Sequence, residues 1–183
     1  MIKELLKKIG IGIVKNQDIS ENQVKIVYLG IGSNLGNRVN NIEKAKYYLI
    51  EQDIDLISVS SYYETYSWPD AEKPKFINIV LKIKCSLTPH ELLKICKIIE
   101  HKLGRRKGPK NSPRECDIDI IDFSGSIIRN KLTLPHKMMH LRNFVLFPLF
   151  EIEKEWIHPS KKISIKNMIF SLSNSDISSI KQI

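Results

Sequence analysis

Residues 76–123 read FINIVLKIKC, SLTPHELLKICKIIEHKLG and RRKGPKNSPRECDIDIIDF, and they predict in succession a strand, a helix, a basic loop and a second strand. The first segment has the two-residue period of a strand, with Ile77, Ile79, Leu81 and Ile83 on one side and Phe76, Asn78, Val80 and Lys82 on the other. We therefore expect a long strand here with one face turned toward the core.

The helix that follows has clear signals at both ends. Thr88 is a suitable N-cap, Pro89 suits the first helical position, and Glu91 completes a capping box with Thr88. Gly104 is expected to end the helix. The spacing predicts a buried stripe at Leu92, Ile95 or Cys96, Ile99 and Leu103.

The flanking segments complete the pattern. Strands are predicted at Val24–Gly30, Ile57–Glu64, Asp117–Phe123 and just before Pro135, and helices at Arg38–Glu51, 143–151 and 163–172. The order strand, helix, strand, strand, helix, strand predicts an α+β fold with a ferredoxin-like βαββαβ core, an antiparallel sheet and short C-terminal helices. We expect residues 24–183 to form one domain and residues 1–23 to be an N-terminal extension.

The composition excludes several classes of protein. The chain has 183 residues, 42% of them hydrophobic, as expected for a single globular domain. Charged residues make up 27% and interrupt every apolar run, so no membrane span is expected. Cys85, Cys96 and Cys116 have no metal-ligand or disulfide spacing. These features predict a cytoplasmic protein without a membrane partner.

The positive charge is concentrated in one segment. The formal net charge is +9, and residues 102–115 hold six basic residues and one acidic residue. Three of the chain's six arginines, Arg105, Arg106 and Arg114, lie in this segment. Arginine binds phosphate oxygens with two parallel hydrogen bonds, and a nucleic-acid surface more often spreads its charge. The segment therefore favours a polyphosphate site over a nucleic-acid partner.

Asp117 and Asp119 stand directly after this segment. Two positions apart on a strand, their carboxylates project from the same face while Cys116, Ile118 and Ile120 face the core. Alone, the motif is equally compatible with a solvated strand face. Beside Arg114 and the basic loop, it indicates Mg²⁺ held together with nucleotide phosphates.

Three weaker motifs remain. The stretch from Gly30 to Gly36 predicts a strand-to-helix turn, and its spacing matches neither a dinucleotide fingerprint nor a Walker loop. Phe76 and Asn78 share one strand face and suit a flat heterocycle, although an amphipathic strand explains them equally well. His136 lies near Lys131 and Thr133 and can line an anion site.

Taken together, these motifs resemble the 6-hydroxymethyl-7,8-dihydropterin pyrophosphokinase family from Lys25 to about Pro159, some three quarters of the chain. The matching segments are YLGIGSNLGNR, SSYYET, FINIVLKI, LTPHELL, IEHKLGR, PRECDIDIIDF, LTLPHKMMHLRNFVLFPLFEI and WIHP. The resemblance implies transfer of pyrophosphate from ATP to the hydroxymethyl group of the pterin, with release of AMP, in folate biosynthesis. It also implies two Mg²⁺ ions, and we expect a monomer, with other folate-pathway enzymes as candidate partners.

The resemblance also implies roles for individual residues. Asp117 and Asp119 would hold the two Mg²⁺ ions, and Arg105 and Arg114 would be catalytic. The pterin would be bound by Gly32, Ser33, Asn34, Thr65, Phe76, Asn78 and Phe144. The nucleotide would be bound by Glu100, Lys107, Ile120, Lys131, Thr133, His136 and Arg142.

The chain departs from the family pattern at three places. Asn111 and Ser112 stand where the family usually has Trp-Gly, and the T-x-P-x-G segment is replaced by Thr65–Pro69 (TYSWP). The basic loop is about one residue shorter, which leaves Arg106 and Lys107 as alternatives for the second loop cation.

Two other classes of function fit the sequence less well than the kinase. A basic ferredoxin-like RNA-binding module is the alternative, although its aromatic signature is missing. A dinucleotide-dependent oxidoreductase lacks a second nucleotide-binding half.

Overall fold

The computed structural model describes residues 24–68, 70–106, 108–109 and 111–183. The expected N-terminal extension and Lys107 lie outside the described residues. The strands are β1 (Lys25–Ser33), β2 (Asp55–Val59), β3 (Tyr63–Thr65), β4 (Phe76–Cys85), β5 (Asp117–Phe123), β6 (Ile128–Arg129), β7 (Thr133–Leu134) and β8 (Lys181–Gln182). The helices are α2 (Arg38–Ile50), α3 (Pro89–Lys102), the 3-10 turn η1 (Met139–Leu141), α4 (Asn143–Ile152), α5 (Ile165–Phe170) and α6 (Asn174–Ser178).

The main sheet confirms the predicted core. Its strands follow the order β5, β1, β4, β3, β8, with β2 also paired to β4, and every pairing is antiparallel. The chain thus runs β1, α2, β2 with β3, β4, α3, β5, which is the expected ferredoxin-like βαββαβ order. Strands β6 and β7 form a separate two-stranded hairpin.

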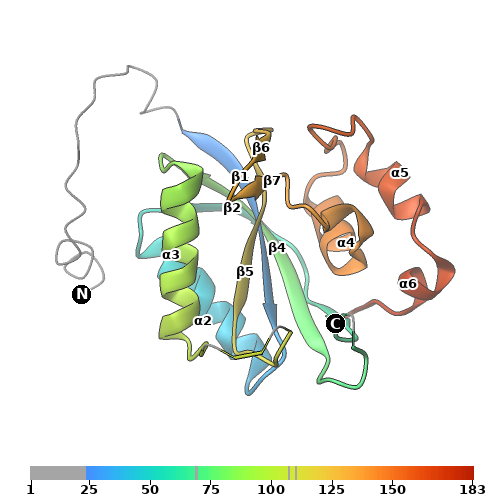
Figure 1. Cartoon of the computed structure of the whole chain (residues 1–183), viewed down its shortest axis with the longest axis horizontal. Helices are drawn as coiled ribbons and strands as arrows, with labels where there is room; N and C mark the ends of the chain where they lie inside the picture. Colours follow the sequence, from blue (N-terminus) through green and yellow to red (C-terminus); the bar gives the residue numbers. More distant parts are fainter. Residues whose placement is uncertain (1–23, 69, 107, 110) are drawn as a thin grey trace.

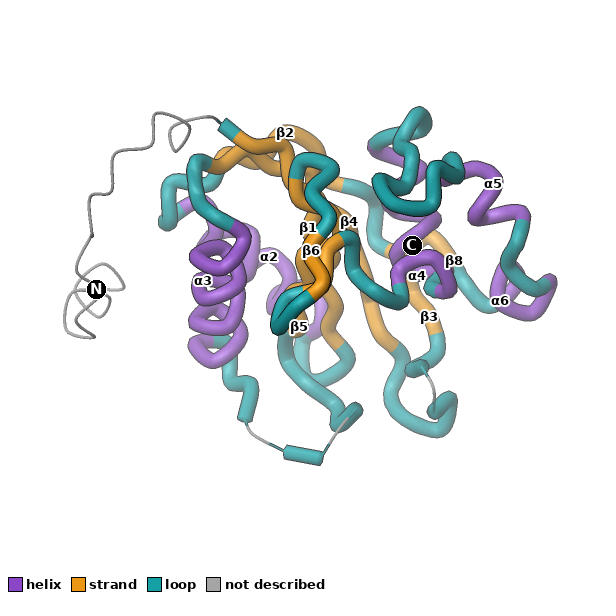
Figure 2. Tube along the Cα trace, turned by 45° about the horizontal axis from the view of Figure 1, so that its top comes forward, coloured by secondary structure: helices purple, strands orange, loops and turns teal. Residues whose placement is uncertain are grey.

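Helices cover both faces of the sheet (Figures 1 and 2). On one face α2 and α3 pack over a core that contains the predicted stripe residues Leu92, Ile95, Cys96 and Ile99. On the other face α4 and α5 pack around a second core that includes Val80 and Trp156. No helix among the described residues has the length and apolar content to cross a membrane.

The capping box predicted for α3 is present. The Thr88 hydroxyl accepts a hydrogen bond from the Glu91 backbone N–H, and the Glu91 carboxylate accepts one from the Thr88 backbone N–H at 2.8 Å. Gly104 follows the helix with a φ of +109°, a backbone conformation that favours glycine. The ends of α3 are therefore determined locally, as the sequence predicted.

The prediction of a single strand at Ile57–Glu64 is wrong, because the structure divides this segment between two strands, β2 and β3. At the break, the Ser60 hydroxyl accepts the Val80 backbone N–H at 2.9 Å. A side chain thereby replaces a main-chain acceptor of the ladder and interrupts the regular alternation. Helix α6 and strand β8 were not predicted, since each is too short to give a periodic signal.

Candidate active site

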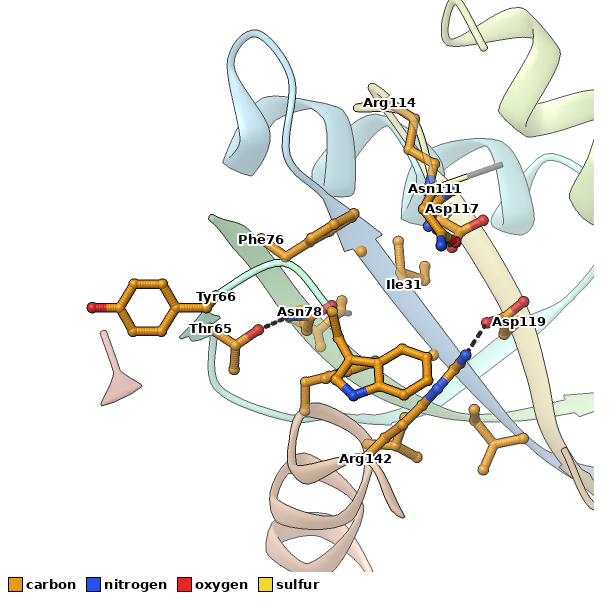
Figure 3. A pocket seen from close by; sticks show the side chains of 17 residues that line it. Ile31, Thr65, Tyr66, Phe76, Asn78, Asn111, Arg114, Asp117, Asp119 and Arg142 are labelled. Atoms are coloured by element: carbon orange, nitrogen blue, oxygen red, sulfur yellow. Dashed lines mark hydrogen bonds and ion pairs between the residues drawn. The ribbon is translucent and has the colours of Figure 1, made fainter. Parts of the chain in front are cut away.

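The strand register sets two glycines between two polar walls. Gly30 and Gly32 of β1 pair with Asp119 and Asp117 of β5, and Gly32 also pairs with Asn78 of β4. Directly opposed residues of an antiparallel pair point to the same face, so the carboxylates and Asn78 flank a glycine floor. These residues line one pocket with Thr65, Phe76, Arg114 and Arg142 (Figure 3). We call it the trough, with a carboxylate wall (Asp117, Asp119) and an amide wall (Thr65, Phe76, Asn78).

The floor must be glycine at position 32. A Cβ there would lie 2.8 Å from Asn78 Oδ1 and 3.3 Å from a ring carbon of Phe76. The first distance is shorter than side-chain carbons tolerate, so only glycine leaves Asn78 in position. The sequence predicted that Gly30 and Gly32 belong to a turn, whereas the structure extends β1 to Ser33 and starts the turn at Asn34.

Arginines from the basic segment neutralise the first carboxylate. Asp117 pairs with Arg105 through Oδ1 and with Arg114 Nη2 through Oδ2 at 3.1 Å. Burial lowers the pKa of Arg105, but the opposing effect of Asp117 and Glu100 is larger and raises it above the ordinary value. The Arg105 guanidinium therefore stays charged beside Asp117, and both arginines present the forked donors that bind phosphate.

Asp119 has two further neighbours, an arginine and a histidine. Its Oδ2 lies 3.6 Å from Arg142 Nη1 and 3.8 Å from His136 Nε2. The His136 Nδ1 accepts the Met138 backbone N–H at 3.3 Å, so a neutral ring carries its proton on Nε2, facing Asp119. Burial lowers the pKa of His136 and outweighs the raising effect of Asp119. The lowered pKa favours this neutral form.

Two arginine nitrogens in the trough have unused hydrogen-bonding capacity. The Nε atoms of Arg114 and Arg142 are buried and find no acceptor in the part of the chain described. Buried donors are nearly always satisfied in a functioning site. An anionic ligand with several oxygens, such as a triphosphate, would supply the missing acceptors.

Glu100 supports the carboxylate wall from behind. Its side chain is only 1% exposed, and it accepts the Ile118 backbone N–H at 2.7 Å and lies 2.8 Å from Arg105 Nη1. Burial raises the pKa of Glu100, although its hydrogen bonds with Lys97 and Ile118 oppose that shift. It lies outside the residues that line the trough, so the structure makes it a support for Arg105 and β5.

The amide wall presents a hydrogen-bonding edge next to an aromatic ring. Asn78 donates through Nδ2 to the Thr65 hydroxyl at 3.1 Å, which fixes the orientation of the amide (Figure 3). Asn78 and Thr65 are both buried, whereas Phe76 is half-buried at the rim. A fixed amide beside a ring suits a flat heterocycle that is read at its edge and stacked on its face.

Aromatic rings and arginines meet above the trough. Arg114 lies 5.5 Å from the centre of the Phe76 ring, and Arg142 lies 5.5 Å from Phe144 and 5.7 Å from Trp68. Trp68 was not predicted as a site residue, yet it lines the pocket with 51% of its surface exposed. In the sequence, Trp68 is an aromatic residue in a Pro-containing loop. A loop has no periodicity from which the direction of a side chain can be predicted.

Ser33 and Asn34 do not face the trough as the family resemblance implied for pterin-binding residues. Both side chains are buried and neither lines the pocket. Asn34 instead accepts the Arg114 backbone N–H at 2.8 Å and donates to the Pro74 carbonyl at 3.1 Å. Its role is to hold the loops before β4 and β5 against the β1–α2 turn.

Five of the described nucleotide-side predictions lie outside the pocket lining: Glu100 and His136, which support the carboxylate wall, and Ile120, Lys131 and Thr133. The Ile120 side chain is 4% exposed in the core under α3, so a nucleotide contact would fall to its backbone, and Ile121 lines the pocket instead. The alternation of β5 explains this exchange, because Ile120 shares the core face with Ile118, whereas Ile121 shares the face of Asp117 and Asp119. Lys131 is exposed and Thr133 half-buried at the β6–β7 hairpin, outside the pocket lining. Lys107 lies outside the described residues.

The donor set fits Mg²⁺ bound together with phosphate. The described residues contain no group of three or more His, Cys, Asp and Glu side chains arranged to hold an ion. Mg²⁺ is commonly bound by one or two carboxylates, with substrate phosphates and water completing the octahedron. Asp117 and Asp119, on one face and surrounded by arginines, match that requirement.

Comparison with known proteins agrees with this geometry. A family model described as 7,8-dihydro-6-hydroxymethylpterin-pyrophosphokinase (HPPK) matches residues 28–154. The 2-amino-4-hydroxy-6-hydroxymethyldihydropteridine pyrophosphokinase of Aquifex aeolicus is 42% identical over 141 residues, covering 76% of this chain and 88% of that protein. The folic acid synthesis protein FOL1 of Dictyostelium discoideum is 39% identical over 161 residues, covering 87% of this chain and 24% of that protein.

Solved structures share the fold. A crystal structure of Plasmodium falciparum HPPK-DHPS with pterin and p-hydroxybenzoate gives a TM-score of 0.69 at 16% identity. The match covers 90% of this chain and 48% of that one, so the chain spans about half the length of this structural relative. From the family model and the 42% identical relative, we conclude that this chain belongs to the 7,8-dihydro-6-hydroxymethylpterin-pyrophosphokinase family.

Proposed function

We propose that this protein transfers the pyrophosphoryl group of ATP to the hydroxymethyl oxygen of 6-hydroxymethyl-7,8-dihydropterin, releasing AMP, in folate biosynthesis. The observation that carries the proposal is the trough itself. Its carboxylate wall faces an amide wall across a glycine floor, so one pocket joins a metal-phosphate site to a heterocycle site. A pyrophosphokinase needs that juxtaposition, because the attacking hydroxyl must meet the β-phosphorus of the nucleotide.

The phosphate side of the trough provides charge stabilisation. As the pterin oxygen bonds to the β-phosphorus, the hydroxyl proton is lost to water, the bond from that phosphorus to the α,β-bridging oxygen breaks, and AMP leaves with the electron pair. Arg105 and Arg114 flank Asp117, where they can stabilise the charge that moves onto the leaving oxygen. Arg142 and the Nε2–H of His136 lie beside Asp119 and can bind the remaining phosphate oxygens.

Asp117 and Asp119 would hold Mg²⁺, which we propose to be two ions. When bound, Mg²⁺ supplies charge neutralisation for the triphosphate. The carboxylates are already paired with arginines in this structure. Mg²⁺ would replace the arginines as the partner of the carboxylates, and phosphate would replace the carboxylates as the partner of the arginines. The carboxylate wall is thus suited to a triphosphate that binds together with Mg²⁺.

The heterocycle side would hold the pterin. Phe76 and Phe144 line the same pocket and would stack on the two faces of the ring. Asn78, oriented by Thr65, would hydrogen-bond to the edge of the ring. Gly32 provides the space for that edge.

The RNA-binding alternative is not favoured. RNA-binding sheets of this topology use an open sheet face with paired aromatics. Here α2 and α3 cover one face, and α4 and α5 pack on the other. A cytoplasmic location, a monomeric state and association with other folate-pathway enzymes belong to the proposal.

An AMP-release assay tests the proposed function. We expect AMP from ATP only when both the pterin alcohol and Mg²⁺ are present. Asp119→Ala should lower the turnover by about a hundredfold or more, because the wall then has a single carboxylate for the metal. Undiminished turnover in this variant would refute the metal-binding role.

Two companion variants make that result specific. Asp119→Asn keeps the volume and removes the charge, so it should be impaired like Asp119→Ala. Asp55→Asn changes an exposed carboxylate on β2, away from the trough, and should keep the turnover of the unmodified protein. Equal loss in all three variants would indicate a general folding defect.

A further inference from the structure

The last eleven residues, 173–183, contact both sides of the heterocycle site. They form α6 and β8, and they lie beyond residue 154, where the match to the family model ends. They line no part of the trough. Their contacts nevertheless converge on two elements that do, the first turn of α4 and the strand β3.

The first contact holds the beginning of α4. Asn143, which is buried, donates through Nδ2 to the Asp176 carbonyl at 2.6 Å and to the Ser179 hydroxyl at 3.0 Å. Its neighbours in sequence are Arg142 and Phe144, both of which line the trough. Helix α6 therefore fixes the residue between two site residues.

The second contact extends the sheet beside β3. Strand β8 pairs with β3 so that Tyr63 opposes Gln182, and the Ile183 backbone N–H donates to the Tyr62 carbonyl at 3.0 Å. Figure 2 draws β8 alongside β3. Thr65, which orients Asn78, is the last residue of β3. Without β8, this strand of three residues would be an edge strand paired on one side only.

The two contacts are also joined to each other. The Glu151 carboxylate on α4 accepts the Ser61 backbone N–H and, at 2.9 Å, the Tyr63 hydroxyl. The Gln182 side chain donates to the Ser61 hydroxyl at 2.9 Å. Helix α4, strand β3 and the C-terminal segment thus form a closed set of hydrogen bonds.

We propose that residues 173–183 are a brace that positions the heterocycle side of the trough, with Asn143 and β8 as its two attachment points. The inference rests on the proposed function, since it assigns these residues to the binding of the pterin. They are positioning residues, because they act on the pterin through Thr65 and Phe144. The phosphate-binding arginines Arg105 and Arg114 lie on the basic segment and make no contact with the brace among the described hydrogen bonds and ion pairs.

Two variants release the attachment points separately. Asn143→Ala removes both side-chain hydrogen bonds to the brace, together with the acceptor of the Phe144 backbone N–H, and Lys181→Pro removes a backbone donor from β8. Phe170→Ser is the control, because this side chain on α5 is 71% exposed and lies outside both attachment points. The measurements are kcat, the KM for ATP, and the KM and Kd for the pterin, the last by calorimetry.

We expect each releasing variant to raise the pterin KM and Kd about fivefold to tenfold, the equivalent of losing one or two hydrogen bonds that fix a binding group. The kcat at saturation should change less than twofold or so, because Arg105 and Arg114 are untouched. The KM for ATP should stay within the same range in Lys181→Pro, and should rise less than the pterin KM in Asn143→Ala, where Arg142 adjoins the released residue. A lower thermal midpoint with an unchanged pterin Kd would overturn the brace and leave a purely structural role.

The outcomes separate the two proposals. An unmodified protein that releases no AMP refutes the proposed function, and the brace with it. An active unmodified protein whose variants bind pterin normally refutes the brace alone. If Lys181→Pro does not fold, Ser179→Ala decides the outcome, because it removes an acceptor of Asn143 Nδ2 and leaves intact both the β8 backbone and the hydrogen bond from the Phe144 N–H to Asn143.

Discussion

At the scale of single residues, the trough depends on the lack of a side chain at position 32. Gly32→Ala would place a methyl group 2.8 Å from Asn78 Oδ1, and Asn78 cannot retreat without leaving the Thr65 hydroxyl. We expect the pterin Kd to rise about tenfold, since small overpacking changes typically cost 1–3 kcal/mol. Calorimetry with the pterin measures the change, and an unaltered Kd in a stably folded variant would contradict the assigned role of the glycine floor.

Trp68 offers a second residue-scale prediction. Half of its surface is exposed at the pocket rim, 5.7 Å from Arg142, so a bound heterocycle can cover it. Trp68→Ala should weaken pterin binding about fivefold, the effect of losing about 1 kcal/mol of aromatic contact, whereas Trp68→Phe should restore most of the affinity. If the phenylalanine variant bound pterin as weakly as the alanine variant, the aromatic contact would be refuted.

The sequence was sufficient for residues whose direction follows from periodicity. The two-residue period of strands placed Asp117 with Asp119, and Phe76 with Asn78, on the faces that the structure confirms. It was insufficient for Trp68, because a loop carries no such period. Ile120 was assigned to the nucleotide from the resemblance, although the same period puts its side chain in the core with Ile118 and puts Ile121 in the pocket.

At the scale of elements, α3 gives the sharpest prediction. Thr88→Ala removes the acceptor for the Glu91 backbone N–H and should lower the free energy of unfolding by about 1 kcal/mol. Thr88→Ser keeps the hydroxyl and should be nearly neutral. Urea denaturation measures both, and an equal loss in the two variants would exclude the capping box as the cause.

Elements with strong local signals were predicted, and elements made by distant contacts were not. Helix α3 carries a cap, a stripe and a terminating glycine within its own sequence. Strand β8 has two residues and exists because β3 offers it an unpaired edge, information that lies over a hundred residues away. The break between β2 and β3 has the same origin, since Ser60 bonds to Val80 on the neighbouring strand.

At the scale of the whole molecule, the excess positive charge has a defined location. The basic segment supplies Arg105 and Arg114 to one side of the carboxylate wall, and Arg142 at the start of α4 supplies the other. The charges of Arg105 and Arg114 are visible in the sequence, because the basic residues of this segment are contiguous. Arg142 is brought to the same wall by the fold, so its part in this charge balance could not be read from local composition.

The stability of the whole molecule should depend on pH through a histidine distant from the trough. His158 is 4% exposed, and its Nδ1 accepts the backbone N–H groups of Ser160 and Lys161, both at 3.3 Å. Burial lowers its pKa below the ordinary value of 6.5, and the neighbouring Lys161, His140 and Arg129 lower it further. A protonated ring would lose both accepted hydrogen bonds.

The sign of the effect follows from proton linkage. As the pH falls through 6.5, the unfolded chain protonates His158 before the folded protein does, so the free energy of unfolding should decrease between 6.5 and the lower pKa of the folded state. Above 6.5 this contribution is fully present. His158→Gln removes the group from the balance, so denaturation midpoints measured from pH 7 down to about pH 5.5 should fall less steeply in that variant. Parallel pH profiles for the variant and the unmodified protein would rule out His158 as the linked group, whatever carboxyls such as Asp122 contribute to both.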